Sequence, residues 1–390
     1  MVMLPYAPWL CWLIPLAGAA LVPLVSAISG KVRDWFSVAV SFIAAAFAVS
    51  MIPSWLEGIT PELLYISFPL FSVGVLWDGL SIFMSCVVTC IGALIVLYSV
   101  KYMEGDPGLT RYYFFILLFI GGMTGLVMAD NLVQLYIFWE VVGLCSYALI
   151  GHWYHRPSAR RAAIKAFLVT RVGDVFLLLG IALLYSYAGT FRFAELASKE
   201  TYLMITAPLT AVALLMFGGA VGKSAQLPLH VWLPDAMEGP TTVSALIHAA
   251  TMVKAGVYLV ARIYTVFPHF LAHDAAWLLT VGWIGGITSL MAATMAVVSM
   301  DAKRVLAYST ISQIGFMFLA LGVGGLHGWY PSQFHLMSHA IFKALLFLSA
   351  GCVIHALHTT DMREMGGMAR YMPITSITAL MGVLSLGGVP

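Results

Sequence analysis

The chain has 390 residues, of which 61% are hydrophobic and only 9% are charged, and its formal net charge is +2. Soluble domains carry about 25% charged residues, so this composition excludes an ordinary soluble protein. The small net charge, with no basic block interleaved with aromatic residues, gives no sign of nucleic-acid binding. Apolar runs of about 20 residues, the length that a helix needs to cross a bilayer, recur along the chain and predict an all-α polytopic membrane protein.

Eleven apolar stretches are predicted to be transmembrane helices. They cover approximately residues 5–29, 36–54, 78–100, 111–129, 131–151, 163–188, 205–225, 241–265, 275–299, 304–325 and 333–357. The first has no positive residue before Lys31, which favours a membrane helix over a cleaved signal peptide. A further apolar run begins near Ile374 and continues to Pro390. We therefore expect the start of a twelfth helix, and the N-terminal part of a longer protein.

Lysine and arginine are distributed unevenly among the loops between these stretches. If the N-terminus lies outside, twelve of the nineteen fall in cytoplasmic loops: Lys31, Arg33, Lys101, Arg111, Arg156, Arg160, Arg161, Lys165, Lys303, Arg304, Arg363 and Arg370. The outer loops hold three: Arg192, Lys199 and Arg262. This bias follows the positive-inside rule and predicts an outside N-terminus.

Seven ionisable side chains interrupt the apolar stretches. A charge at the centre of a bilayer costs at least about 2.5–3.5 kcal/mol, so such residues are expected to have a function. Movement of ions or protons through the membrane is the natural use for groups of both signs. They are Glu140, Asp174, Lys223, His248, Lys254, His339 and Lys343.

Glu140 and Lys223 lie in the fifth and seventh stretches. Pro228 and the weakly helical pair 218–219 predict a broken or bent helix close to Lys223, and broken helices at membrane depth border protein or water-filled cavities. A buried carboxyl can change protonation state when a cationic partner moves, and a desolvated lysine loses its proton readily. The alternatives are a neutral or purely structural Glu140 and a Lys223 that extends to the membrane interface.

His248 and Lys254 are six residues apart in the eighth stretch, so in a continuous helix they would lie on different faces and could link two sites. The alternative for His248 is a hydrogen-bonded core histidine. Asp174, on the sixth stretch, shares a face with Arg171 at i, i+3 spacing, and a simple ion pair is its alternative.

The eleventh stretch carries His335, His339 and Lys343 at i, i+4 and i+8, along one stripe of a helix. Titratable groups at this spacing favour a proton relay, with structural polar contacts as the alternative. A metal site is disfavoured because lysine is a poor ligand and no acid joins the histidines locally.

Four segments resemble the largest antiporter-like membrane subunit of respiratory complex I, the L-type or mitochondrial chain 5. They are FWEVVGLCSYALIGHWY, VGKSAQLPLHVWLPDAMEGPTTVSALIHAATMVKAGVYLVAR, DAKRVLAYSTISQIGFMFLALG and FHLMSHAIFKALLFLSAGCVIHA. The KSAQ and DAMEGPT segments favour the L-type over its M- and N-type paralogues. Most members have Pro after the Thr that aligns with Thr241, whereas this chain has Thr242.

The resemblance implies a role for each buried group. Glu140 and Lys223 match the family's Glu–Lys pair, His248 a connecting histidine, and Asp174 an acid that couples neighbouring subunits. His335, His339 and Lys343 match the central relay, and Lys254 is a further candidate. The implied fold has helices 1–3 in residues 1–110, then two inverted repeats in residues 111–265 and 266–390. The first repeat has its broken helix near Lys223, and the second stops at the start of helix 12, before the family's exit-side lysine and lateral helix.

The resemblance also implies a proton-translocating subunit of a redox-driven complex, in which this chain carries no cofactor and no metal. Flavin, iron–sulfur clusters and a quinone-like acceptor would belong to partner subunits in a peripheral redox arm, beside M- and N-type membrane subunits. The expected location is the plasma membrane of a prokaryote, or a thylakoid or inner mitochondrial membrane in an organelle. The alternatives are the large subunit of a multisubunit sodium/proton antiporter, a subunit of a membrane-bound hydrogenase, and a purely structural subunit.

Overall fold

The computed structural model describes residues 3–61, 66–68, 72–198 and 208–389. Within these ranges the chain is a bundle of helices, and its one sheet is the antiparallel pair β1 (Ile66–Ser67) and β2 (Ser72–Val73). Ten of the described helices are long and apolar enough to cross a membrane. The prediction of an all-α polytopic fold is confirmed, and the protein is an integral, multi-pass membrane protein.

The long helices follow the predicted stretches closely. They are α1 (Ala7–Ile28), α2 (Gly30–Leu56), α3 (Gly79–Tyr102), α4 (Leu109–Met128), α5 (Leu132–Ile150), α6 (Pro157–Ala188), α9 (Leu209–Lys223), α10 (Thr241–Ala249), α11 (Met252–Val266), α13 (Ala275–Val298), α14 (Ala302–Val323), α15 (Gly325–Leu357) and α17 (Pro373–Leu386). Short helices complete the described fold: α7 (Phe193–Leu196), η1 (Asp235–Glu238), α12 (Pro268–Leu271), η2 (Met362–Glu364) and α16 (Met368–Tyr371).

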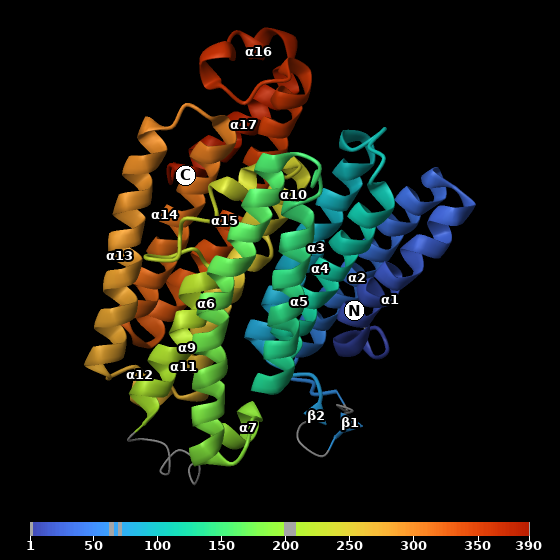
Figure 1. The fold of residues 1–390 in the computed structure, drawn as a ribbon. Coiled ribbons are helices and arrows are strands. Elements are labelled where there is room, and N and C mark those ends of the chain that lie inside the picture. Colours follow the sequence, from blue (N-terminus) through green and yellow to red (C-terminus); the bar gives the residue numbers. More distant parts are fainter. Residues whose placement is uncertain (1–2, 62–65, 69–71, 199–207, 390) are drawn as a thin grey trace.

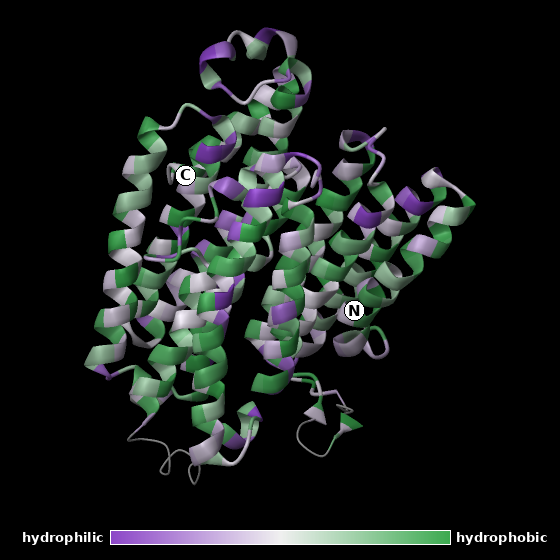
Figure 2. Cartoon of the chain, in the orientation of Figure 1, coloured by the Kyte–Doolittle hydropathy of each residue, from purple (hydrophilic) through white to green (hydrophobic). Residues whose placement is uncertain are grey.

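The helices stand side by side, from α1 and α2 at one end of the molecule to α13 at the other (Figure 1). The most apolar window of the α10–α11 span is entirely buried, whereas only 22% of that of α13 is buried. Colouring by hydropathy shows green, apolar residues along the outer helices (Figure 2). Because α10 and α11 are shielded by the other helices, polar groups on them do not face lipid.

Among the described helices two breaks lie inside the bundle, and of these the sequence predicts only the one near Lys223. As expected, α9 ends at Lys223, and Ala225 follows with a φ of 51°. The second break separates α10 from α11 at Ala250 and Thr251, where the sequence predicts one continuous helix. Here both the backbone N–H (3.1 Å) and the hydroxyl (2.8 Å) of Thr251 donate to the Leu246 carbonyl, which replaces the regular helical pattern.

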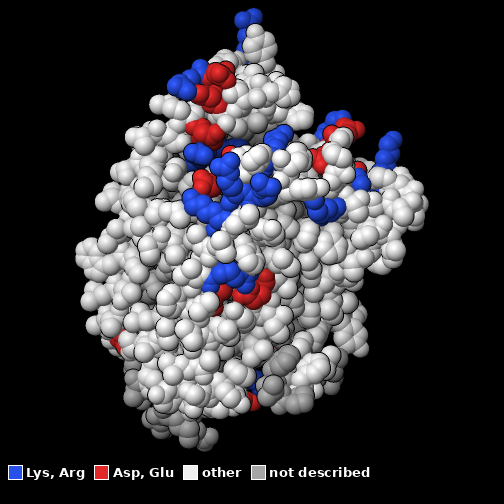
Figure 3. All heavy atoms as spheres, viewed as in Figure 1, with Lys and Arg blue, Asp and Glu red and all other residues white. Residues whose placement is uncertain are grey.

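Lysine and arginine gather at one end of the molecule, around η1, the α5–α6 turn and the loop before α17 (Figure 3). This clustering agrees with the uneven distribution of lysine and arginine among the predicted loops. The orientation with the N-terminus outside stays a prediction. Arg262 departs from that count. It belongs to α11 and is only 2% exposed, so it is not a solvated outer-loop residue.

Glycines allow α13 and α14 to pack with their backbones in contact. A Cβ atom added to Gly285 would lie 2.6 Å from both the Gly315 carbonyl oxygen and the Leu319 nitrogen. A Cβ added to the neighbouring Gly286 would lie 3.5 Å from a Leu319 methyl group, an ordinary contact. This close approach positions α14, which contributes to the site described below.

Gly285→Ala is therefore expected to lower stability by about 1–3 kcal/mol, because overpacking against rigid backbone cannot relax cheaply. Gly286→Ala is the matched control, since both substitutions gain the same helix propensity. Thermal unfolding of the purified protein in detergent checks this. Equal melting temperatures for the two variants would contradict it.

Candidate functional site

Four charged side chains from α5, α6 and α9 form one cluster, named here the first cluster: Glu140, Arg171, Asp174 and Lys223. Arg171 pairs with the Glu140 carboxylate and lies 3.5 Å from Asp174 Oδ2. The Lys223 ammonium lies 3.3 Å from the same Asp174 oxygen. Asp174 and Lys223 are fully buried, whereas Glu140 and Arg171 are each 27% exposed. The cluster therefore runs from the edge of the bundle to its interior.

The structure pairs these residues differently from the expected Glu140–Lys223 pair. Asp174 is the partner of Lys223, and Arg171 is the partner of Glu140. The expected i, i+3 pairing of Arg171 with Asp174 is present. Sequence reasoning missed Trp139, whose indole N–H donates to Asp174 Oδ1 at 2.5 Å.

Glycines bring this cluster together. A Cβ on Gly143 would lie 2.4 Å from the Lys223 nitrogen and 2.8 Å from an Arg171 nitrogen, so a side chain there would displace both cationic groups. A Cβ on Gly173 would lie 2.8 Å from the Gly218 carbonyl oxygen, so α6 and α9 touch through their backbones. Asp174 directly follows Gly173, so this backbone contact brings its carboxylate close to Lys223.

A second cluster, named here the central cluster, joins α11, α14 and α15. Lys254 Nζ lies 2.5 Å from His339 Nδ1, and His335 Nε2 lies 2.6 Å from the Gln313 amide oxygen. The rings of His335 and His339 are 6.3 Å apart between centroids. Lys254, a further candidate in the sequence, thus lies in direct contact with the predicted relay. Gln313 was missed, because one amide on an apolar helix carries no distinguishing signal.

Lys343 and His248 flank the central cluster. Lys343 is fully buried and donates to the Leu306 carbonyl at 3.1 Å. His248, also fully buried, packs against Phe347 with ring centroids 4.8 Å apart. Within the described residues, neither ring nitrogen of His248 has a hydrogen-bond partner. Buried polar atoms are rarely left so, which makes His248 a candidate for a transient proton carrier.

The two helix breaks connect the clusters. Ser224, the residue after Lys223, donates its hydroxyl to the Val253 carbonyl at 2.8 Å. Val253 directly precedes Lys254 in α11. The end of one broken helix is thereby fixed against the beginning of another, with a buried lysine at each. This arrangement can hold protons and exchange them locally, because the Lys254 ammonium donates and a neutral His339 imidazole accepts at the neighbouring position.

Two family models match the chain. Residues 129–390 match the family described as "NADH:quinone oxidoreductase/Mrp antiporter, TM". Residues 67–113 match "NADH-Ubiquinone oxidoreductase (complex I), chain 5 N-terminus". The chain therefore belongs to the transmembrane family shared by NADH:quinone oxidoreductases and Mrp antiporters, and the resemblance read from its motifs is confirmed.

Curated relatives include subunit L of the F(420)H(2) dehydrogenase of Methanosarcina mazei, which is 48% identical over 406 residues, covering 95% of this chain and 60% of that one. Chain 5 of the NAD(P)H-quinone oxidoreductase of Picosynechococcus is 44% identical over 408 residues, covering 98% and 60%. The chain thus spans about 60% of the length of these relatives.

Two solved complexes contain similar chains. One is the Mrp complex from Dietzia, with a TM-score of 0.85, 30% identity, and coverage of 97% of this chain and 43% of that one. The other is an archaeal membrane-bound sulfane sulfur reductase, with a TM-score of 0.90, 26% identity, and coverage of 98% and 78%. Each of these two similar chains belongs to a larger complex.

The pairing of Asp174 with Lys223 gives a stability prediction. Asp174→Asn leaves a fully buried ammonium beside Arg171 without its carboxylate, and breaking a buried ion pair in this way costs about 3–5 kcal/mol. We expect the double variant Asp174→Asn/Lys223→Met to recover much of the loss, because no unpaired ammonium remains. Thermal unfolding in detergent measures both. An Asp174→Asn protein as stable as the double variant would refute the pairing.

Proposed function

We propose that this chain is a proton-translocating subunit of a complex I-type, redox-driven pump. The observation that carries the proposal is the joining of two buried clusters of titratable groups at two helix breaks. Family membership supports it, as do relatives named as subunits of an F(420)H(2) dehydrogenase and an NAD(P)H-quinone oxidoreductase. Broken helices that meet at membrane depth supply polar groups for ions in the same way in transporters.

In this proposal a proton enters near Glu140, at the partly exposed edge of the first cluster, and reaches Lys223. It passes across the Ser224–Val253 contact toward Lys254 and His339, with His248 as a carrier beside them. Lys343 receives it farther along α15, and His335 extends the same stripe. Waters would complete the hydrogen-bonded links between these groups.

Arg171 gives the first cluster a physical means of switching. It contacts both Glu140 and Asp174, and Asp174 is also the partner of Lys223. When Arg171 moves toward Asp174, Lys223 shares its counter-charge and is less able to hold a proton. Two unit charges 4 Å apart interact by about 4 kcal/mol at an effective dielectric constant of 20, enough to drive such a transfer.

The energy would come from electron transfer on other chains. In this proposal flavin, iron–sulfur clusters and a quinone-like acceptor belong to a peripheral redox arm, and M- and N-type subunits adjoin this chain in the membrane. A prokaryotic plasma membrane is the proposed location, since relatives occur in an archaeon and a cyanobacterium.

The structural match to the Mrp complex favours a second candidate, the large subunit of a cation/proton antiporter. The same buried groups would then exchange sodium for protons without any redox partner. Vesicles that lack an electron donor separate the two functions. Sodium-dependent proton movement in such vesicles would favour the antiporter.

Lys223→Ala in the assembled complex tests the relay. We expect proton translocation to slow by about 10²-fold, the lower end of what a positioned proton-transfer group contributes. Lys165→Ala is the control, because Lys165 is 41% exposed and pairs with Asp235 outside the clusters. Proton uptake and electron transfer are measured separately in proteoliposomes. Unchanged pumping per electron in an assembled Lys223→Ala complex would exclude the relay and favour a structural subunit.

A further inference from the structure

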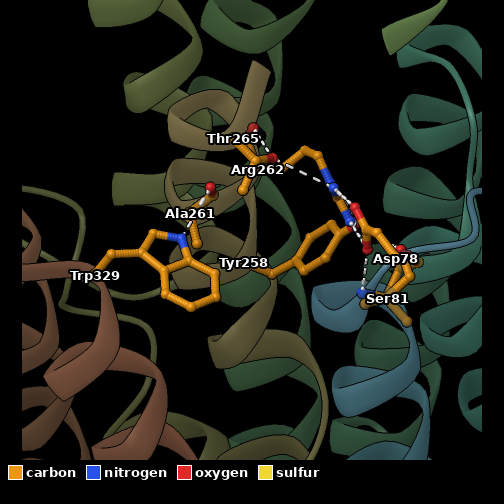
Figure 4. Close-up of polar contacts among 8 residues, drawn as sticks. Asp78, Ser81, Tyr258, Ala261, Arg262, Thr265 and Trp329 are labelled. Carbon is orange, nitrogen blue, oxygen red and sulfur yellow. Dashed lines mark hydrogen bonds and ion pairs between the residues drawn. The ribbon is translucent and has the colours of Figure 1, made fainter. Parts of the chain in front are cut away.

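A buried arginine lies near the C-terminal end of α11, which is the outer end in the predicted orientation, and is saturated with hydrogen bonds (Figure 4). Arg262 pairs through two nitrogens with the Asp78 carboxylate, with one contact at 3.1 Å. It also donates to the Ser81 hydroxyl at 2.8 Å and, through two nitrogens, to the Tyr258 hydroxyl at 3.1 Å. Arg262 thereby joins α11 to the start of α3.

This network separates solvent from the bundle interior. The Asp78 side chain is 34% exposed, whereas that of Arg262 is 2% exposed. Tyr258 is fully buried and donates to the Val127 carbonyl at 2.8 Å, which seals the contact against α4. The guanidinium therefore occupies the boundary between an accessible carboxylate and a closed interior.

Polar groups continue inward from Arg262 on two helices. On α11, Lys254, Tyr258 and Arg262 recur at i, i+4 and i+8, with a rise of about 6 Å between successive residues. On α3, Ser81 is followed at the same spacing by Ser85 and Thr89, all fully buried. The stripe on α11 leads from the ion pair toward Lys254, which contacts His339.

Arginine differs from the other groups on this stripe. Its guanidinium is not deprotonated in proteins, so it cannot relay a proton. A permanent charge in a narrow polar path instead repels protons and other cations, as arginines do in selective pores. Lys254 and Tyr258, by contrast, can both donate and accept.

We infer that the Arg262–Asp78 ion pair is a cation barrier, which closes an outward polar path descending from Lys254 through Tyr258. The inference rests on the proposed function, because a barrier matters only where protons occupy the central cluster. Asp78 holds the guanidinium in place from the solvent side. The barrier keeps protons that are bound in the central cluster from leaking to the outer face of the membrane.

The test measures passive proton leak in the assembled complex, reconstituted in liposomes without an electron donor under an imposed potassium diffusion potential. The double variant Arg262→Gln/Asp78→Asn removes both charges and leaves none unpaired. We expect its leak to exceed that of the wild type by about tenfold or more, because the positive charge that faces the buried path is removed while the negative charge lost with it lies on the exposed side. Arg262→Lys keeps the positive charge but loses the planar guanidinium with its paired N–H donors. Its leak should stay near the wild-type value.

Trp329→Phe is the matched control for packing. It removes the bond from the Trp329 indole to the Ala261 carbonyl at 3.3 Å, next to Arg262, without changing charge (Figure 4). If the double variant does not assemble, Arg262→Gln alone replaces it, because partly exposed Asp78 stays solvated. A neutral variant that leaks no more than the wild type overturns the inference, and so does an Arg262→Lys variant that leaks as much as the neutral one. Failure of the wild type to pump with an electron donor would instead refute the proposed function.

Discussion

The cost of placing charge in a medium that cannot solvate it governs this structure. Each buried cation meets the cost by one of two means. Arg262 and Lys223 contact carboxylates, whereas Lys254, Lys303 and Lys343 contact neutral acceptors: His339 Nδ1, the carbonyls of Met237 and Gly239, and the Leu306 carbonyl. A lysine bonded to a neutral acceptor gives up its proton without leaving a buried carboxylate unpaired. Lys223, by contrast, can pass its proton on only when Arg171 takes its place as the partner of Asp174.

The positions of the arginines follow the same division. Arg171 lies at the partly exposed edge of the first cluster, and Arg262 lies where α11 meets the outer boundary. Between them the ionisable groups of the two clusters are lysines, histidines and Asp174, which are side chains able to change protonation state. In the proposed function, the fixed charges at both limits would enclose these titratable groups in a compartment for protons.

Much of the fold, and part of the site, could be predicted from the sequence. Pro228 and the glycines before Lys223 predict the first helix break. The spacing of His335, His339 and Lys343 predicts that they share one stripe of a helix. The second break could not be predicted, since Ala250 and Thr251 are ordinary helix residues and the bend depends on where the Thr251 hydroxyl donates. The Asp174–Lys223 pairing was equally hidden, because it depends on backbone contact between α6 and α9 at Gly173. Arg262 was misread for a related reason: its proximity to a helix end suggested solvent, and only the packing of α3 shows its burial.

The two helix breaks also give the proposed transfer between the clusters an electrostatic cost. Lys223 is the last residue of α9, where the partial negative charge of unpaired carbonyls stabilises a cation. Lys254 lies in the first turn of α11, where the partial positive charge of unpaired N–H groups opposes one. Because Ser224 and Val253 fix these two helix ends together, a proton moving from Lys223 to Lys254 leaves a favourable helix end for an unfavourable one. In the proposed relay, His339, bonded to Lys254, offers the acceptor that offsets this step, so transfer between the clusters would require His339 to be neutral and in place.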